Sequence, residues 1–376
     1  MRARPDGVRA SVSGVRSVTR REVLGLRVRA QQLDRESGTV ADTAILDLGP
    51  QDTGADGARW ALALRGVSAP AEDDLATAWT IRGAPHVYRR ADLPGVAAAT
   101  APFSDADAGK RIFDASKPLR AAGIPNLTAL DVVADAMRSI VTGPMVKGEM
   151  SGRLTAVLDE PYLRFCVPCG ATHPYEQPFR LSALRAGLEL EPGTSPPVLR
   201  PIPGFTPADE VPERLDVVRA YLRLLGPATP KLVAGYLDAP VKDVQARWPR
   251  DAVEVDVDGQ RRWLLEDDLD ALGDPPRGTR LLAPFDLHLQ ARDRALLVGD
   301  AARAKDLWRT LGRPGGVLVD GEVVGTWRAR RTGSGAGVEV SSWDAVDAPT
   351  RRTVAEQAER LAASRGLALR TVDIPD

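Results

Sequence analysis

"RLDVVRAYLRLLGPATPKLVAGYLDAPVKDVQARW", residues 214–248, contains two helical segments separated by the break GPATP. The stretches that follow, AVEVDVDG and QRRWLLEDD, predict two strands over residues 252–259 and 260–268. Asp258-Gly259 between them is a strong signal for a tight hairpin turn. A helix, a turn, a second helix and a β-hairpin in this order predict a winged helix.

The same order of elements occurs earlier, in residues 126–158. NLTALDVVADAMRSIVTGPMVKGEMSGRLTAVL predicts a helix from Asn126, a break at Thr142-Gly143-Pro144 and a second helix from about Val146. Both breaks contain a Gly-Pro pair, and Pro suits the first position of a helix because its missing N–H leaves no bond unmade. A strand over Tyr162–Cys166 and a short helix over FRLSALRAGL follow. We therefore expect a second helix-turn-helix unit here.

A first unit of this kind precedes both. RREVLGLRVRAQQL, residues 20–33, has helical periodicity and one basic face, and GARWALALRG, residues 57–66, predicts a further helix. Ala78–Ile81 and His86–Tyr88 predict two short strands around Arg82-Gly83. The first 275 residues therefore predict three tandem winged helices.

The C-terminal part differs in character. Alternating apolar and polar residues in TRLLAPFDLHLQARDRALLV and GGVLVDGEVVGTWRARRTGSGAGVEVSSWDAV predict antiparallel strands, with turns at Asp320-Gly321 and Gly333–Gly337. A helix over about 348–365 and a strand LALRTVDI close the chain. The predicted fold class is α+β. Its predicted units are three winged helices over residues 1–120, 121–195 and 196–275, and a small β-barrel with a terminal helix over residues 276–376.

Length, charge and motifs limit the possible functions. A chain of 376 residues exceeds one core of ordinary size, and its net charge of −1 means that binding to DNA would depend on local basic patches. Residues 1–33 carry eight arginines and no lysine, a bias that a GC-rich genome would also produce. No apolar run is long enough to span a bilayer, so we expect a cytoplasmic protein without a membrane partner. No phosphate-binding Gly-rich motif follows a strand, so we expect no nucleotide and no other cofactor.

Several stretches together resemble a known family over nearly the whole chain. They are LGPQDTG with ALALR, WTIRGAPHVYRRADL, AYLRLLGPATP, and above all LLAPFDLHLQARDRALLV followed by LGRPGGVLVDGEVVGTWR. The chain is similar to the AlkZ-like winged-helix DNA glycosylases, which include the YcaQ-type interstrand-crosslink repair glycosylases. The resemblance implies tandem winged helices and a C-terminal β-barrel around a channel for double-stranded DNA.

The resemblance also implies a catalytic motif, Gln-x-Gln or Gln-x-Asp, in which an amide orients water and a carboxylate stabilises the cation or acts as a base. This places Gln51 and Asp52 in the candidate catalytic site. The motif is incomplete in every register, because Gly49 or Pro50 occupies the first position, or Thr53 the second when Gln51 is taken as the first. Without the resemblance, Gln51 and Asp52 would be interpreted as a polar turn in which Asp52 caps the next helix.

Four residues around the first predicted hairpin are candidate DNA contacts: Arg82, His86, Arg89 and Arg90. Guanidinium groups bind phosphate oxygens in a bidentate manner, and an adjacent histidine could contact phosphate or a base. A packed or solvated histidine is the alternative for His86. Asp286 matches a feature of the family at the start of the barrel, and we expect it to pair with Arg292 or Arg294 and hold the barrel to a winged helix.

Cys166, Cys169 and His173 in CVPCGATH have the spacing of zinc ligands. Zinc normally takes four protein ligands, and here only Glu176 is available as a fourth. A reduced turn packed in the second unit and a redox pair are the other interpretations, and we do not include a metal in the predicted site.

Two main functions follow. The first is a monofunctional DNA glycosylase that excises alkylated or crosslinked purines. The second is a non-enzymatic winged-helix DNA-binding protein, a regulator or lesion sensor, that has lost part of the catalytic motif. A scaffold that binds proteins through its winged helices is the third.

Overall fold

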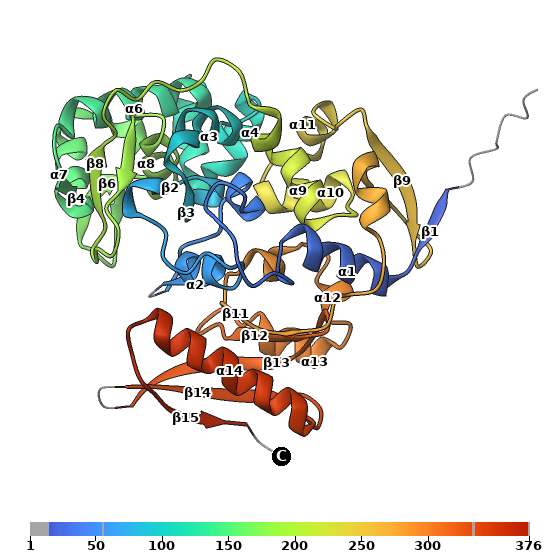
Figure 1. Ribbon diagram of the computed structural model, residues 1–376. Helices are drawn as coiled ribbons and strands as arrows, with labels where there is room; N and C mark the ends of the chain where they lie inside the picture. Colours follow the sequence, from blue (N-terminus) through green and yellow to red (C-terminus); the bar gives the residue numbers. More distant parts are fainter. Residues whose placement is uncertain (1–14, 55, 333–334, 375–376) are drawn as a thin grey trace, which may run out of the picture.

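The computed structural model describes residues 15–54, 56–332 and 335–374, which form a mixed α+β fold. Figure 1 shows the helices α1 to α11 and their hairpins in the upper part of the molecule and a sheet with helix α14 below them. None of the described helices is both long enough and apolar enough to cross a membrane.

The third predicted unit has the elements expected from the sequence. Helices α9 (Val217–Leu225), α10 (Pro230–Leu237) and α11 (Val241–Ala246) precede the antiparallel hairpin of β9 (Ala252–Val257) and β10 (Gln260–Leu265). Thr229 caps α10, and Asp258 and Gly259 both have positive φ, as a tight hairpin turn requires. A strand from the N-terminus, β1 (Arg16–Val18), pairs with β9 in parallel.

The middle part of the chain also contains its predicted helices. The main ones are α6 (Asn126–Ile140), α7 (Lys147–Val157) and α8 (Glu176–Ala183), and the hairpin of β5 (Leu163–Cys166) and β6 (Ala171–Pro174) lies between the last two. Pro230 opens α10, but Pro144 does not open α7, because the short strand β4 (Met145–Val146) lies between them. Shorter helices precede this part: α3 (Leu93–Thr100), α4 (Asp105–Arg111) and α5 (Ser116–Ala121).

Elements of the first predicted unit are shared with the other two. Helix α1 (Arg20–Ala30), which Thr19 and Glu22 cap, packs against α9, and α2 is Gly57–Ala63. The hairpin of β2 (Leu75–Trp79) and β3 (Pro85–Arg89) belongs to one five-stranded sheet with β7 (Leu188–Leu190), β8 (Val198–Pro201) and β4.

Buried apolar side chains form two clusters. The smaller lies mainly within residues 108–199, and the larger joins segments from the N-terminus, α9–α10 and the C-terminal sheet. The described residues therefore have helices and hairpins in the predicted order, and their buried apolar side chains are shared between two clusters.

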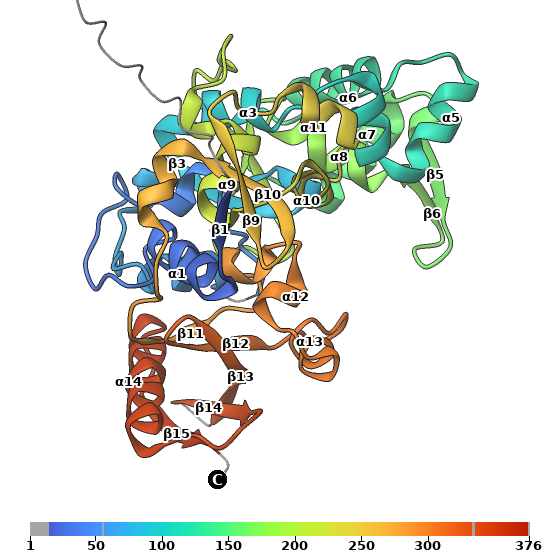
Figure 2. The same cartoon turned by 90° about the vertical axis from the view of Figure 1, so that its right-hand side faces the viewer.

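The C-terminal sheet confirms the predicted small β-barrel only in part, because the strands form half of a barrel. Its strands, in the order β11 (Thr279–Leu282), β12 (Gly315–Val319), β13 (Glu322–Thr332), β14 (Gly335–Ser342) and β15 (Leu369–Asp373), form a curled half-barrel. Helix α14 (Ala348–Ser364) contacts both edge strands, β11 and β15, on the open side (Figure 2). The edge strands do not pair with each other, so the helix covers the open side that a barrel would close with hydrogen bonds.

One of the two turns predicted for this sheet lies wholly within the described residues, and it forms where the sequence predicts it. Asp320 and Gly321, both with positive φ, form the predicted turn between β12 and β13. Of the turn predicted at Gly333–Gly337, residues 333 and 334 lie outside the described residues. Two short helices, α12 (Arg294–Leu297) and α13 (Ala301–Leu307), connect β11 to β12.

Candidate functional site

The candidate motif lies in a short extended segment beside strand β3. The N–H of Asp52 donates to Pro85 O at 2.8 Å and the N–H of Val87 donates to Pro50 O at 3.0 Å, so that Gln51 and His86 form an isolated antiparallel bridge. Successive side chains of an extended segment point to opposite sides. The side chains of Gln51 and Asp52 therefore lie in two different environments.

Both polar atoms of the Gln51 amide are bound. Its Nε2 donates to Thr53 Oγ1 at 2.8 Å, and its Oε1 accepts a hydrogen bond of 3.0 Å from Gln290 Nε2. Gln290 ends the 3₁₀ turn Leu287–Gln290, so the partner comes from a segment far away in the sequence. Gln290 is a site residue that sequence reasoning did not single out, although it lies in the LLAPFDLHLQARDRALLV stretch.

Asp52 faces the other way. Its Oδ1 accepts a hydrogen bond of 3.1 Å from the N–H of Ala58 at the start of α2, which is the capping role that the sequence allowed. Burial raises the pKa of the Asp52 carboxyl and the nearby Asp56 adds to this, whereas the Ala58 N–H and Arg59 act in the opposite direction. Asp52 lines a cavity of about 740 Å³ together with Asp56, Arg59 and residues at the C-terminal end of α14.

Tyr88 fills the space at the first motif position. Gly49 has a φ of +81°, and a Cβ atom placed on it would lie 2.5 Å from Tyr88 Cζ. The Tyr88 hydroxyl bonds with Thr80 Oγ1 at 2.8 Å and donates to Leu48 O at 3.4 Å, which holds the ring in place. A glutamine side chain therefore has no room at position 49 while Tyr88 keeps this position.

His86 is buried beneath the bridge. Its Nδ1 lies 2.9 Å from Ala84 O, and because a carbonyl only accepts, Nδ1 carries the proton and donates. Burial, with a smaller effect of Arg82, lowers the pKa of His86 to about 3, so the ring is neutral at pH 7. His86 is 1% exposed, which matches the packed alternative and leaves its ring out of reach of a DNA phosphate.

Arg89 and Arg90, predicted as DNA contacts, are occupied by protein groups. Arg89 donates to Asp47, Asp92 and two backbone carbonyls. Arg90 binds Glu189 and the carbonyls of residues 73 and 75. Both guanidinium groups are thus bound within the protein, and we do not include them in the proposed interface.

Arg82 belongs instead to a group of four arginines near Gln51, the others being Arg292, Arg294 and Arg313. Arg82 donates to the carbonyl of Tyr236 and lies over its ring, Arg294 lies 5.0 Å from the centroid of Trp308, and Arg313 lies 4.9 Å from that of Phe285. Arg313 also donates to Leu289 O at 3.4 Å, directly before Gln290. These contacts fix Arg82, Arg294 and Arg313, and the Leu289 carbonyl links Arg313 to the segment that supplies Gln290.

No carboxylate lies within ion-pair distance of these four arginines in residues 15–54, 56–332 and 335–374. Burial, together with the charges of the other three arginines, lowers the pKa of Arg313 to about 10. The Nε atoms of Arg292 and Arg313 are buried and have no hydrogen-bond partner among the described residues. The four arginines, which we call the arginine cluster, therefore carry positive charge that no carboxylate of the described residues neutralises at ion-pair distance.

Asp286 pairs with a residue other than the predicted ones. Its carboxylate binds the guanidinium of Arg65, on the segment after α2, at 2.9 and 3.0 Å, and both side chains are fully buried. Burial raises the pKa of Asp286, but the charge and hydrogen bonds of Arg65 outweigh it and the net shift is downward. Asp286 forms an ion pair with the N-terminal part of the chain, as predicted. Its partner, however, is Arg65 and neither Arg292 nor Arg294.

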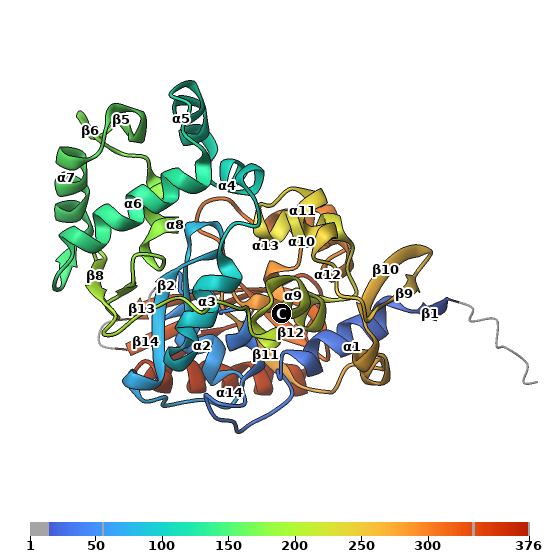
Figure 3. The same cartoon turned by 90° about the horizontal axis from the view of Figure 1, so that it is seen from above.

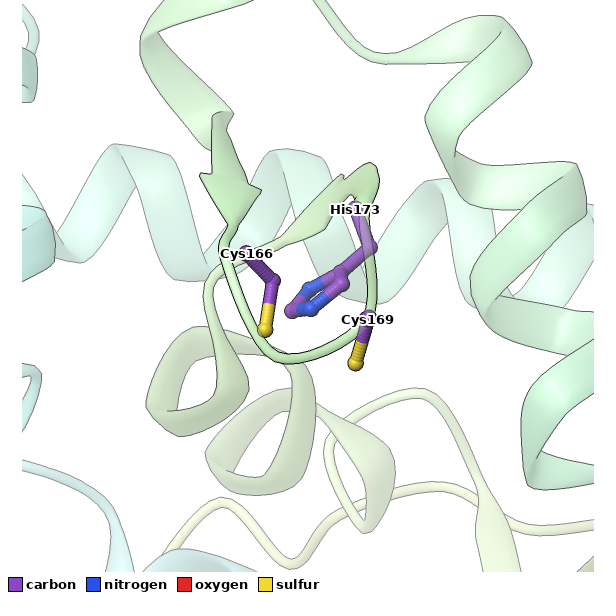
Figure 4. A group of neighbouring side chains, drawn as sticks. All are labelled: Cys166, Cys169 and His173. Atoms are coloured by element: carbon purple, nitrogen blue, oxygen red, sulfur yellow. The ribbon is translucent and has the colours of Figure 1, made fainter.

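Cys166, Cys169 and His173 come together at the tip of the β5–β6 hairpin, far along the chain from Gln51 (Figure 4). Their ligand atoms lie within 4.8 Å of one another. Hydrogen bonds from His173 and from the N–H of Cys169 lower the pKa of the Cys166 thiol to about 7. Glu176, the fourth ligand considered from the sequence, already accepts hydrogen bonds from Lys147 and Arg180.

Comparisons with known proteins identify the family of this chain. A family model described as DNA glycosylase AlkZ-like matches residues 40–364. A solved structure, Streptomyces sahachiroi DNA glycosylase AlkZ, superposes with a TM-score of 0.71 at 22% identity and covers 96% of this chain and 100% of its own. A search of curated proteins found no match. The family match spans both the Gln51 segment and the segment that supplies Gln290 and three of the four clustered arginines, and the chain belongs to the AlkZ-like DNA glycosylase family.

Proposed function

We propose that this protein is a monofunctional DNA glycosylase that excises alkylated or crosslinked purines from double-stranded DNA. The observation that carries the proposal is the Gln51 amide, fixed by Thr53 and Gln290 beside the arginine cluster. A fixed amide next to cations without carboxylate partners combines a group that can orient water with a surface that binds phosphate.

Removal of an alkylated purine makes few demands on the enzyme. A purine alkylated at N7 or N3 is cationic, so it leaves without a general acid, and the enzyme has to place water and stabilise the positive sugar. In our proposal Gln51 places the water. Asp52 is the second candidate, whose carboxylate would stabilise the sugar if the nucleotide enters from the 740 Å³ cavity that Asp52 lines.

The proposed DNA interface follows the arginine cluster. Arg82 from the turn after β2 and Arg292, Arg294 and Arg313 from the C-terminal segment would contact phosphates on either side of the reacting nucleotide. We keep the winged-helix units over residues 1–120, 121–195 and 196–275 and the C-terminal unit over 276–376 as a proposed division, and the cytoplasm as the proposed location.

An excision assay tests the catalytic part. Duplex DNA that contains N7-methylguanine is incubated with wild type, Gln51→Ala, Asp52→Asn and the exposed control Gln245→Ala, and the released base is measured. We expect wild type and Gln245→Ala to release base at equal rates and Gln51→Ala to be at least about 100-fold slower. Release by wild type at no more than the spontaneous rate would contradict the proposal. Borohydride trapping of a covalent enzyme–DNA product would contradict the monofunctional part.

A second candidate function is supported by one observation. Tyr88 occupies the place of the first motif side chain at Gly49, which is expected if the protein binds damaged DNA without cutting the glycosidic bond. Under this alternative, wild type binds the lesion duplex with a salt-dependent affinity and releases no base. If wild type does not bind DNA at all, both of these functions are excluded, and only a scaffold that binds other proteins remains.

A further inference from the structure

We propose that the tip of the β5–β6 hairpin is a metal site of the zinc class, formed by the thiolates of Cys166 and Cys169 and the ring of His173. This site lies outside the proposed catalytic segment and does not depend on the proposed function. Figure 4 shows the His173 ring between the two cysteine side chains. The three residues come from the end of β5, the connecting turn and β6.

The spacing of the ligand atoms fits one ion. In tetrahedral coordination with zinc–sulfur bonds of ~2.3 Å, two ligand atoms lie about 3.8 Å apart. The three ligand atoms here are within 4.8 Å of one another, so each has to move by about 1 Å or less, which rotation of the exposed Cys169 and the half-buried Cys166 and His173 side chains supplies. The backbone does not need to change.

The hairpin register places the ligands on the same side. Cys166 pairs with Ala171 and Arg164 pairs with His173, so Cys166 and His173 are diagonal neighbours on one face of the hairpin. In the turn, the N–H of Cys169 donates to Cys166 O and that of Gly170 to Val167 O, both at 3.2 Å. Gly170 takes a φ of +61°, which allows the chain to return directly after Cys169 and brings its thiol back beside Cys166.

The orientation of His173 is that of a metal-binding histidine. Its Nδ1 lies 2.9 Å from Pro174 O, and because the carbonyl can only accept, Nδ1 carries the proton. In the neutral ring the lone pair is therefore on Nε2, the atom that interacts with the Cys166 side chain and that an ion would bind instead. Ligating histidines commonly donate their second N–H to a backbone carbonyl in this way, which fixes both tautomer and ring direction.

Protein ligands fill three positions, and the fourth is left to solvent. Glu176 Oε1 accepts from Lys147 at 2.7 Å and from Arg180 at 2.6 Å, so this carboxylate is bound elsewhere. The tip is exposed, with Phe165 64% and Val167 80% accessible. A two-stranded hairpin is marginally stable alone, so an ion at its tip would hold these exposed apolar side chains in one conformation. Figure 3 shows that this hairpin lies at the outer end of the molecule near α5 and α7.

Cobalt binding tests the site. Reduced full-length protein, freed of metal with a chelator under anaerobic conditions, is titrated with Co²⁺ alone and its absorption is recorded. We expect one equivalent to bind with thiolate-to-cobalt charge-transfer and tetrahedral d–d bands, and Zn²⁺ to displace it. Cys166→Ser and Cys169→Ser should lose these bands and His173→Ala should weaken binding, whereas the control Thr172→Ala, on the same strand, should bind as wild type does.

Three results would overturn the proposal: no cobalt bands in the reduced wild type, bands that persist in both serine variants, or binding that is unchanged in His173→Ala. Folding of each variant is checked by circular dichroism, and because the ligands lie at an exposed tip we expect all of them to fold. The readout is absorption of the bound ion, so an inactive glycosylase leaves the result interpretable.

Discussion

Gly49 shows how a single residue determines the shape of the candidate site. Its positive φ and the ring of Tyr88 together exclude any side chain, and Tyr88 is held by Thr80 and Leu48 O. The missing glutamine is therefore part of a consistent local packing, in which a phenol takes the place of an amide. The Gln51 amide accepts a hydrogen bond from Gln290, which lies in a different segment.

Gly49→Ala tests this packing. The new Cβ combines a strained backbone with overlap against Tyr88, so we expect a loss of about 2–4 kcal/mol in the free energy of unfolding, measured by urea denaturation. Gly54 also has a positive φ, of +96°, but a Cβ added there would meet no atom within 4 Å, so Gly54→Ala should cost only about 1 kcal/mol. Equal losses in the two variants would contradict the role of Tyr88.

At the scale of the elements, the buried ion pair of Arg65 and Asp286 fixes the position of the chain after α2 relative to the turn Leu287–Gln290. The same turn ends at Gln290, so the pair positions the residue that binds Gln51. Arg65 also donates to Ala61 O and Gln31 O, which connects α1, α2 and this turn through one side chain.

Arg65→Met should destabilise the protein by about 3–5 kcal/mol, because it leaves the Asp286 carboxylate buried without a partner. The matched exposed pair is Arg153 with Glu149, and Arg153→Met should cost less than about 1 kcal/mol. Unfolding by urea at pH 7 gives both values. The double variant Arg65→Met/Asp286→Leu should recover part of the loss, and a double variant less stable than Arg65→Met would argue against this account.

At the scale of the whole molecule the net charge is −1, but the arginines differ in whether a carboxylate pairs with them. Most described arginines near the centre bind carboxylates or carbonyls, as Arg27 and Arg262 bind Asp293. The arginine cluster makes no ion pair within the part of the chain that the structure describes, and its cations come from segments more than 200 positions apart in the sequence. The arginine cluster is therefore a local concentration of positive charge in a chain whose net charge is close to zero.

The salt dependence of DNA binding measures this concentration. Replacing Arg292, Arg294 or Arg313 by Gln should each reduce the slope of log Kobs against log salt by about 0.9, because each lost phosphate contact releases one counterion fewer. Arg153→Gln, in an exposed ion pair on α7, should leave the slope unchanged. Binding titrations on plain duplex at several salt concentrations give the slopes. Slopes equal to that of wild type in all three cluster variants would show that DNA binds elsewhere.

Local features of the fold could be predicted because their causes are local. The α9–α10 break, the Asp258-Gly259 and Asp320-Gly321 turns and the terminal helix follow from periodicity, caps and residues that tolerate positive φ. The prediction of a small β-barrel is right for the curled sheet but not for its closure, because alternation identifies strands but does not show whether the edge strands meet. In the structure α14 covers that gap.

The sequence by itself determined the α+β class, the order of helices and hairpins, the resemblance to the glycosylase family and the segment that contains Gln51 and Asp52. Only the tertiary structure decided that these two side chains face opposite sides, that Gln290 binds Gln51, and that Arg65 pairs with Asp286. The reason is physical: periodicity and turn preferences act over a few residues, whereas a hydrogen bond between residues 239 positions apart depends on how whole elements pack.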